Sequence, residues 1–548
     1  MTILSRFIAR VYHLPPAETY EIVIDKGLEA SMPDGVILRA DRYYSRYGIN
    51  LPTLLIRTPY GRARLGVIWG NIFAERGFQV VIQSCRGTDD SGGEISPFRE
   101  EGTDGMATIE WLNTQDWFDG RLGMAGPSYM GFTQWAVARS AGTTLKAFST
   151  QVTTSEFYTA IHQGGSFSLE IFLQWMQITN SFGSSALHYF KSAAHMKARM
   201  KKAVSHLPLC DADEIVVDRH MKYWHDWLEH EKPGDEWWAR EDYSNTVAEV
   251  TAPNHLISGW HDFLLPQLLR DYCSLEQAGR NPYLTIGPWA HSSNELTKTG
   301  LQESLVWLRA YLLGDMKALR KPPVRIYVMG ANEWRDLDVW PPGNIKLQQW
   351  YLQPEQGLDP EIPPTSKASR FIYDPNDPTP NVGGATNATF AKGAGAQDNR
   401  KLESRSDVLA FTSKVLEQDT EIIGPVSAEL HVSSSLEYTD FFVRLCDVYP
   451  SGKSMNVCDG LLRISPELLT AATDDGMRLI KIELSPTAYR FQCGHRIRVQ
   501  VSSGAHPRFA RNLGTDEPLA TGTHTKVAEQ KVYHDSVHPS AVILPIVS

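Results

Sequence analysis

The sequence of 548 residues predicts three structural parts: an α/β part, a helical insertion within it, and a C-terminal all-β part. In the first third of the chain, apolar runs typical of buried strands alternate with helical stretches. From about Thr153 the pattern becomes helical, and from about Ile345 short strands are separated by Gly, Pro, Asn and Asp. One hydrophobic core seldom serves a chain of this length, so several parts are expected.

The α/β part is expected to comprise residues 1–152 and 248–344. Its apolar runs include TLLIRTPY, FQVVIQSCRG and RLGMAG before the insertion, and NHLISGW and YLTIGPW after it. Helical stretches such as GTDGMATIEWLNTQ separate these runs. Buried strands that alternate with helices indicate a mostly parallel sheet covered by helices on both faces.

The insertion is expected over residues 153–247, where long amphipathic patterns occupy residues 184–206 and 214–230. No run typical of a strand interrupts this stretch, which favours a helical cap over the α/β part. The alternative is that these helices simply extend the helical layer. The last part, residues 345–548, has short strands with regular turn signals, which are typical of a β-sandwich or jelly roll.

Composition excludes several classes of function. The formal net charge is -10, and the sequence has none of the basic clustering that nucleic-acid binding needs. No segment approaches the roughly 20 apolar residues of a membrane span. Residues 3–11 show apolar positions at helical spacing and predict a short helix packed on the body, with a membrane-surface anchor as the less favoured alternative. Six cysteines without C-x-x-C pairs indicate reduced thiols and a cytoplasmic location rather than a disulfide scaffold or zinc site.

The stretch GMAGPSYMGFTQWAVA combines an apolar run, a sharp turn at Ser128 and a helix. Such a strand–turn–helix exposes the serine hydroxyl at the carboxyl end of a parallel sheet, where the next backbone N–H groups face the same space. Serine needs a base and an orienting carboxylate to act as a nucleophile, and α/β-hydrolases supply them in the chain order Ser, acid, His. Asp262 follows one predicted strand and His291 follows the next, so that order is present here.

Each of these residues also has a simpler interpretation. Ser128 and Asp262 could be helix N-caps, because both residue types are favoured there. A single loop histidine is most often a surface residue, and His261 competes with His291 as the base. The agreement of three strand-end positions in the right order favours the catalytic interpretation.

The loop CRGTDDSGGE contains Asp89, Asp90 and Glu94, but their spacing fits no common calcium loop. A tight turn near Ser128, with Arg86 paired to a carboxylate, is the favoured interpretation. No metal site and no cofactor is therefore predicted.

Together these motifs resemble serine hydrolases of the cocaine-esterase type, which are related to X-prolyl dipeptidyl peptidases, alpha-amino-acid ester hydrolases and cephalosporin acylases. The resemblance covers most of the chain, from DGVILRAD and LIRTPYGR to SGWHDF, IGPWAHSS and GHRIRVQVSSGAHPRFARN. The motif G-x-S-Y-x-G of that family accounts for Met130 at a position where other nucleophile turns have glycine. The resemblance implies an α/β-hydrolase domain, an inserted helical cap and a C-terminal jelly roll.

The resemblance also implies roles for single residues. Ser128, Asp262 and His291 match the catalytic triad. The Tyr60 hydroxyl and the Tyr129 backbone N–H match the two donors of the oxyanion hole. Without the resemblance, Tyr60 would pass as a tyrosine packed after a strand.

Two further positions concern the substrate pocket. Phe263 follows the acid and suggests an apolar wall. Trp175 is expected either to contact an apolar acyl group or to belong to the core of the insertion. The insertion begins with only Glu156 and Glu170 as carboxylates that could hold a substrate ammonium, which argues against amino-ester or aminopeptidase specificity.

The resulting hypothesis is a serine hydrolase that cleaves a small carboxylic ester through an acyl-enzyme on Ser128. An acylase or dipeptidyl-peptidase type of amide hydrolase is the first alternative. A non-catalytic protein that binds glycans or a partner through the β part is the second. Neither a nucleic-acid nor a membrane partner is expected, and a homodimer is a weak expectation from the general frequency of dimers.

Overall fold

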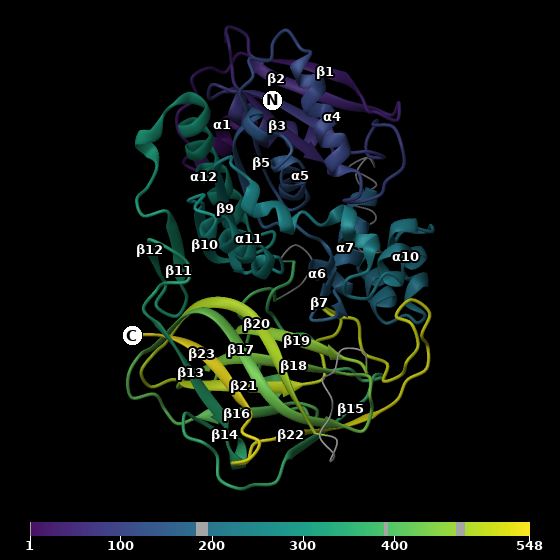
Figure 1. Cartoon of the computed structure of the whole chain (residues 1–548), viewed down its shortest axis with the longest axis vertical. Coiled ribbons are helices and arrows are strands. Elements are labelled where there is room, and N and C mark those ends of the chain that lie inside the picture. The colour runs from purple at the N-terminus through teal and green to yellow at the C-terminus, as the bar shows by residue number, and fades with distance from the viewer. Residues whose placement is uncertain (1, 182–195, 388–392, 467–476) are drawn as a thin grey trace.

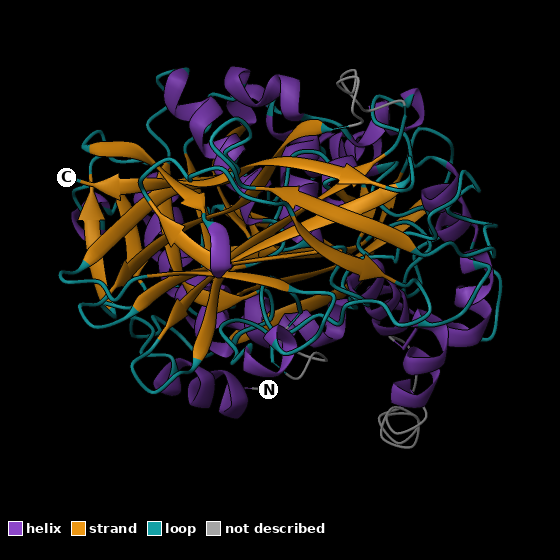
Figure 2. Cartoon of the chain, turned by 90° about the horizontal axis from the view of Figure 1, so that it is seen from below, coloured by secondary structure: helices purple, strands orange, loops and turns teal. Residues whose placement is uncertain are grey.

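Two large β-sheets dominate the computed structural model, which describes residues 2–181, 196–387, 393–466 and 477–548. The sheet formed by the first part of the chain lies in the upper half of Figure 1, and the sheet formed by the last part lies below it. Viewed from below in Figure 2, the strands fill the middle of the molecule and most helices lie toward its rim.

Within the described residues, the first sheet has ten strands in the order β1-β2-β4-β3-β5-β6-β9-β10-β11-β12. Their bounds are β1 Ile22–Ser31, β2 Ile37–Ser45, β3 Thr53–Thr58, β4 Gln79–Ser84, β5 Leu122–Pro127, β6 Leu145–Gln151, β9 Asn254–His261, β10 Tyr283–Ala290, β11 Val324–Val328 and β12 Glu333–Leu337. From β4 to β11 neighbouring strands are parallel, whereas β1, β2 and β12 join antiparallel at the edges. The sheet is therefore mixed, with the predicted parallel strands at its centre.

Helices cover both faces of this sheet because successive residues of a buried strand point to opposite sides. Leu55 packs with Trp135 on one face, while its neighbour Leu54 packs with Leu305 on the other. The first face is covered by α4 (Glu101–Asn113), α5 (Tyr129–Ala138) and α11 (Leu265–Gln277). The second face is covered by α3 (Asn71–Ala74) and α12 (Asn294–Leu313), and the short helix α2 (Arg62–Leu65) precedes α3.

Helix α1 (Thr2–Val11) forms where the sequence predicts it, but its apolar face does not pack on the body. Ile3 and Phe7 are 82% and 63% exposed. The helix is attached instead through Ser5, which donates a hydrogen bond of 2.5 Å to the buried Glu75, and through the partly buried Ile8. Among the described residues, no helix is long and apolar enough to cross a membrane.

A mainly helical segment connects β6 to β9. It contains α6 (Tyr158–Ile161), α7 (Leu169–Ser181), a helical stretch at residues 196–204, α9 (Ala212–Val217) and α10 (Lys222–Glu229). Residues 184–195 of the helix predicted over 184–206 lie outside the described residues. The segment buries its own aromatic cluster, which includes Phe157, Phe172 and Trp227.

The expectation that no strand interrupts this segment is wrong. β7 (His162–Gln163) and β8 (Ser166–Phe167) form a small antiparallel hairpin. The hairpin contacts the C-terminal part, because the backbone N–H of Arg463 donates to the carbonyl of Gly164 at 2.7 Å. Two residues per strand are too few to produce a recognisable alternation of apolar and polar positions.

In its described residues, the C-terminal part is all-β apart from the short helix α13 (Arg400–Glu403) and a 3-10 turn. Its described strands form one sheet of eleven, in the order β15-β22-β17-β23-β13-β14-β16-β21-β18-β19 with β20 beside β17. Their bounds are β13 Ile345–Leu352, β14 Gly357–Asp359, β15 Ser369–Tyr373, β16 Leu409–Ser413, β17 Thr420–Ser434, β18 Thr439–Val448, β19 Ser454–Ile464, β20 Arg478–Phe491, β21 Arg496–Ser502, β22 Ala528–Tyr533 and β23 Ala541–Val547. This part joins the first sheet through backbone hydrogen bonds between Met329 and both Ala488 and Arg490.

Candidate active site

Ser128 occupies the turn between β5 and α5 in a strained backbone conformation. Its φ of 58° and ψ of -124° lie in a region that L-residues rarely adopt, at a cost of about 1–3 kcal/mol. The Ser128 backbone N–H donates to the Gln151 carbonyl at 2.8 Å, and its carbonyl accepts from the Thr153 hydroxyl at 2.9 Å. Contacts from β6 and the residues after it therefore hold the turn in place and present the hydroxyl at the end of the sheet.

Two glycines explain why this turn tolerates Met130. Gly126 has a φ of +140°, and a Cβ there would lie 2.7 Å from the Met130 Cβ. A Cβ at Gly131 would lie 2.5 Å from the Thr153 Cγ2. Crowding by the Met130 and Thr153 side chains thus favours glycine two residues before the serine and three residues after it, while Met130 itself packs into the core with Ala125 and Leu301.

The structure brings together the three residues that the sequence predicts as nucleophile, acid and base. The His291 Nε2 lies 3.1 Å from the Ser128 Oγ, and its Nδ1 lies 2.6 Å from the Asp262 Oδ2. Asp262 is fully buried, and its other oxygen accepts the Leu264 backbone N–H at 2.8 Å. This second contact fixes the carboxylate so that it faces the imidazole.

His261, the competing histidine, points elsewhere. It is buried, and burial lowers its pKa to about 4. Its charged neighbour is Asp459 of the C-terminal part, and its ring lies close to Gly395. His261 therefore packs between the two parts of the chain, and His291 is the histidine that faces Ser128.

Tyr60 lies beside the serine and carries a hydrogen bond that the sequence does not reveal. The Trp175 indole N–H donates to the Tyr60 hydroxyl at 3.2 Å. Desolvation raises the pKa of the Tyr60 phenol, and hydrogen bonds with Trp175, the Ser128 side chain and the Tyr129 backbone partly oppose that rise. The Tyr60 hydroxyl and the Tyr129 backbone N–H thus lie close together beside the Ser128 side chain.

The Tyr129 side chain is anchored by hydrogen bonds at its hydroxyl. Its hydroxyl donates to Glu101 at 2.6 Å and accepts the Phe98 backbone N–H at 3.0 Å. Glu101 in turn pairs with the fully buried guanidinium of Arg57 at 2.6 Å. Burial, together with the Glu101 charge, raises the pKa of Tyr129 well above its usual value, so the phenol stays protonated and fixes the backbone that follows Ser128.

Ser128 opens into a cavity of about 400 Å³ with mostly apolar walls. Trp175 and Phe263, predicted as pocket residues, both line it, and the Phe263 ring lies 4.6 Å from the His291 ring. Much of the remaining wall could not be predicted from the sequence, and it includes Leu65, Ile68, Phe98, Phe157, Ile171, Phe172, Ile178 and Leu296. Only the helical spacing of Ile171, Trp175 and Ile178 on α7 offered a signal for one of these walls.

The carboxylates considered for substrate binding are engaged elsewhere. Glu156 pairs with Arg270 at 3.0 Å, and Glu170 accepts the Gln174 amide at 3.2 Å. Neither lines the cavity, and among its described lining residues there is no aspartate or glutamate.

The loop that follows β4 is held by ion pairs. Arg86 pairs with Asp34 and Asp104, each at 2.6 Å, so the predicted pairing of Arg86 is confirmed. Asp89 accepts the backbone N–H of Arg62, and Asp90 pairs with the Arg62 guanidinium. Both carboxylates are therefore engaged in contacts within the protein.

Comparisons with known proteins identify the family of this chain. The family model described as X-Pro dipeptidyl-peptidase (S15 family) matches residues 34–293, and that described as the X-Pro dipeptidyl-peptidase C-terminal non-catalytic domain matches residues 317–543. Cocaine esterase from Rhodococcus sp. (strain MB1 Bresler) is 31% identical over 94% of this chain and 97% of its own length.

Two solved structures have the same fold. An aminopeptidase from a marine sediment archaeon, Thaumarchaeota archaeon, superposes with a TM-score of 0.82 at 21% identity and covers 97% of this chain and 98% of its own. An alpha-amino acid ester hydrolase superposes with a TM-score of 0.80 at 22% identity and the same coverage. The chain therefore belongs to the X-Pro dipeptidyl-peptidase (S15) family, and it is similar to cocaine esterase over nearly its whole length.

Proposed function

We propose that this chain is a serine hydrolase that cleaves carboxylic esters in two steps. The observation that carries the proposal is the unbroken path from the buried Asp262 carboxylate through His291 to the Ser128 hydroxyl. In the first step the Ser128 Oγ attacks the ester carbonyl carbon while the His291 Nε2 takes its proton. The carbon–oxygen bond to the alcohol then breaks, and His291 returns the proton to the departing oxygen.

In the second step water takes the place of serine. His291 removes a proton from water, the resulting hydroxide attacks the acyl carbon, and Ser128 leaves with the proton that His291 returns. Asp262 keeps the imidazole in the orientation that faces Ser128 and stabilises the imidazolium that forms in each step. The products are the free acid, the alcohol and the unchanged enzyme.

Negative charge on the carbonyl oxygen is stabilised by the Tyr60 hydroxyl and the Tyr129 backbone N–H. Because both donors are already in place, they need no reorganisation when the charge develops, and each therefore lowers the activation free energy. The Tyr129 contacts with Glu101 and Phe98 keep the backbone donor rigid.

The architecture assigned to this function is an α/β-hydrolase domain at residues 1–152 and 248–344, a helical cap at 153–247 and a jelly roll at 345–548. The parallel strands with helices on both faces support the first assignment. Trp175 supports the second, because it reaches from α7 to the oxyanion hole. The boundary near residue 344 is supported by the change from the first sheet at β12 to the second at β13.

The cavity favours esters of neutral, apolar acids as the substrate class. Its described lining offers aromatic and aliphatic side chains, with Arg64 at the exposed rim. A dipeptidyl-peptidase substrate carries a free α-ammonium group, and burying that group without a carboxylate partner costs binding energy. Amide hydrolysis is the second candidate, and the description of the S15 family model is the observation that favours it.

A small-molecule ester is thus the proposed partner, and the cytoplasm the proposed location. All six cysteines have free thiols, which suits a reducing compartment. A homodimer is proposed on general frequency alone.

A fluorophosphonate probe followed by peptide mass spectrometry tests the mechanism. We expect modification at Ser128 and loss of labelling in Ser128→Ala. A panel of p-nitrophenyl esters and matched anilides, with acetyl, benzoyl and α-aminoacyl groups, tests the substrate class. Benzoyl and acetyl esters should be cleaved faster than the α-aminoacyl ester and all anilides. Labelling at another residue would refute the mechanism, and faster anilide cleavage would assign the enzyme to the amide class.

A further inference from the structure

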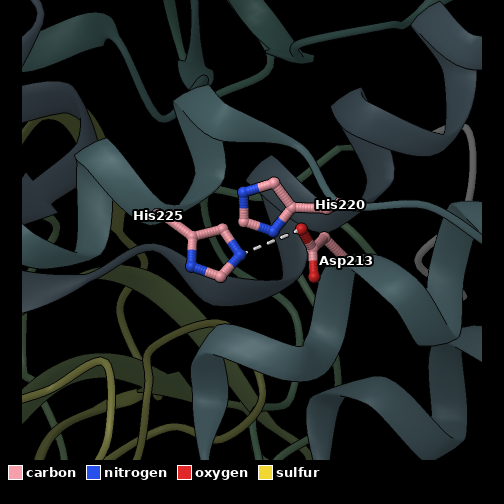
Figure 3. Close-up of side chains that lie close together, drawn as sticks. All are labelled: Asp213, His220 and His225. Carbon is pink, nitrogen blue, oxygen red and sulfur yellow. Dashed lines mark hydrogen bonds and ion pairs between the residues drawn. The ribbon is translucent and has the colours of Figure 1, made fainter.

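Two histidines and an aspartate meet at the turn between α9 and α10. The nearest ligand atoms of Asp213, His220 and His225 all lie within 4.8 Å of one another. Figure 3 shows the His225 ring facing the Asp213 carboxylate, with the His220 ring beside both. None of the three lines the active-site cavity, so the proposed hydrolysis does not use them.

The backbone holds the Asp213 carboxylate in a fixed orientation. Asp213 is fully buried, its Oδ1 accepts the Glu214 N–H at 2.8 Å, and its Oδ2 accepts the Met221 N–H at 2.7 Å. Helix α9 ends at Asp218 in the left-handed conformation, with a φ of 58°, which turns the chain back toward Asp213. This turn therefore places His220 and His225 beside a carboxylate whose orientation the backbone already fixes.

The spacing suits a transition-metal ion. The His225 Nε2 lies 3.2 Å from the Asp213 Oδ2. Two ligands on a tetrahedral zinc ion, each about 2.0–2.1 Å from the metal, lie about 3.3 Å apart. The His220 and His225 ring centroids are 4.1 Å apart, and because His220 is exposed its ring can turn toward the same point.

We propose that Asp213, His220 and His225 form a binding site for a divalent transition-metal ion of the zinc class, with water in the fourth position. Imidazole nitrogen is a preferred ligand of zinc, copper and nickel, whereas calcium and magnesium prefer oxygen ligands throughout. The backbone N–H groups of Glu214 and Met221 act as the outer contacts that orient the carboxylate ligand.

The site connects to the substrate pocket through α10. Tyr223 and Trp227 on that helix contact Trp175, with ring centroids 6.0 Å apart in each pair. A metal ion that joins the start of α10 to α9 therefore stabilises the aromatic layer behind Trp175. Its role is structural, because no ligand touches Ser128 or the cavity.

Calorimetric titration with ZnCl₂ of the full-length, tag-free protein, stripped with chelator beforehand, tests the proposal. We expect one equivalent to bind in wild type, and binding at least about 100-fold weaker in His220→Ala and in His225→Ala, since loss of an outer contact alone costs about 10–100-fold. His230→Ala is the matched control, because His230 also pairs with an aspartate, Asp235 at 2.8 Å, and belongs to no group of three metal-ligand residues in the described part of the chain. The control variant should bind zinc as wild type does.

Two further measurements separate metal binding from changes in folding. His220 is exposed, so His220→Ala should keep the wild-type Tm without metal, and only wild type and the control should gain about 2 °C at zinc 100-fold above Kd. Co²⁺ should give the visible absorption of nitrogen and oxygen ligands. A cobalt–thiolate band, no binding to wild type, or binding that both histidine variants retain would each overturn the proposal.

Discussion

Replacement of Tyr60 by phenylalanine removes one hydroxyl and leaves the ring. In the structure the Trp175 indole N–H donates to the oxygen of this hydroxyl at 3.2 Å, so this hydrogen bond does not use the hydroxyl proton. The Tyr129 backbone N–H stays in place, because its anchor at Glu101 does not involve Tyr60. Under the proposed mechanism the variant loses one of two oxyanion donors, which is worth about 2.7–4 kcal/mol, or roughly 10²–10³ in kcat.

Steady-state kinetics with a p-nitrophenyl ester measures this loss. The KM should change little, because the hydrogen bond strengthens mainly in the transition state. Trp175→Phe is the companion variant: it keeps an aromatic ring in the wall, and it removes the N–H that orients Tyr60 together with part of the indole ring. Loss of that neutral hydrogen bond is worth about 0.5–1.5 kcal/mol, so its kcat should fall by about 2–10-fold.

The relative loss of kcat in the two variants tests the role proposed for Tyr60. If Tyr60→Phe keeps a kcat within about threefold of wild type, or changes only KM, the hydroxyl does not stabilise the transition state. If Trp175→Phe is as slow as Tyr60→Phe, the tryptophan acts directly on the substrate and does not act through the tyrosine.

Three further outcomes concern stability and the serine turn. Glu101→Gln removes the nearer charged partner of the buried Arg57 and leaves Asp104 at 4.0 Å, so urea titration should show a loss of about 3 kcal/mol in unfolding free energy; a loss under about 1 kcal/mol would contradict this. Burial raises the pKa of Asp271 to about 7, and a carboxyl with a raised folded-state pKa loses stabilisation as the pH rises through that value. Wild type should therefore lose more unfolding free energy than Asp271→Asn from about pH 5 to about pH 8, and equal losses would rule out Asp271 as the cause. Gly131→Ala places a Cβ 2.5 Å from Thr153 and should lower both Tm and kcat, whereas Gly343→Ala, with nothing within 4 Å, should match wild type.

The three central residues of the site could be predicted because each follows a recognisable strand. The carboxyl ends of parallel strands meet at one edge of a sheet, so Ser128, Asp262 and His291 had to converge once the strands were identified. This argument needs only the chain order and the direction of each strand.

Contacts between separate parts of the chain could not be predicted in this way. The bond from Trp175 to Tyr60 joins residues 115 positions apart, and no local pattern encodes it. The apolar face of α1 points outward, although the apolar face of an amphipathic helix usually packs on the protein. Burial of Ser5 against Glu75 decides which side of this helix packs. The cluster at Asp213 depends on the left-handed conformation of Asp218, which follows α9. The residue types there do not predict that conformation.

The hydrogen bond between Trp175 and Tyr60 has a consequence for the catalytic cycle. One of its partners belongs to α7 in the helical segment, and the other to the loop after β3. Any displacement that lifts α7 from the sheet to admit an ester or release an acid also withdraws the donor that orients the tyrosine. The position of α7 and the orientation of the Tyr60 hydroxyl are thereby coupled.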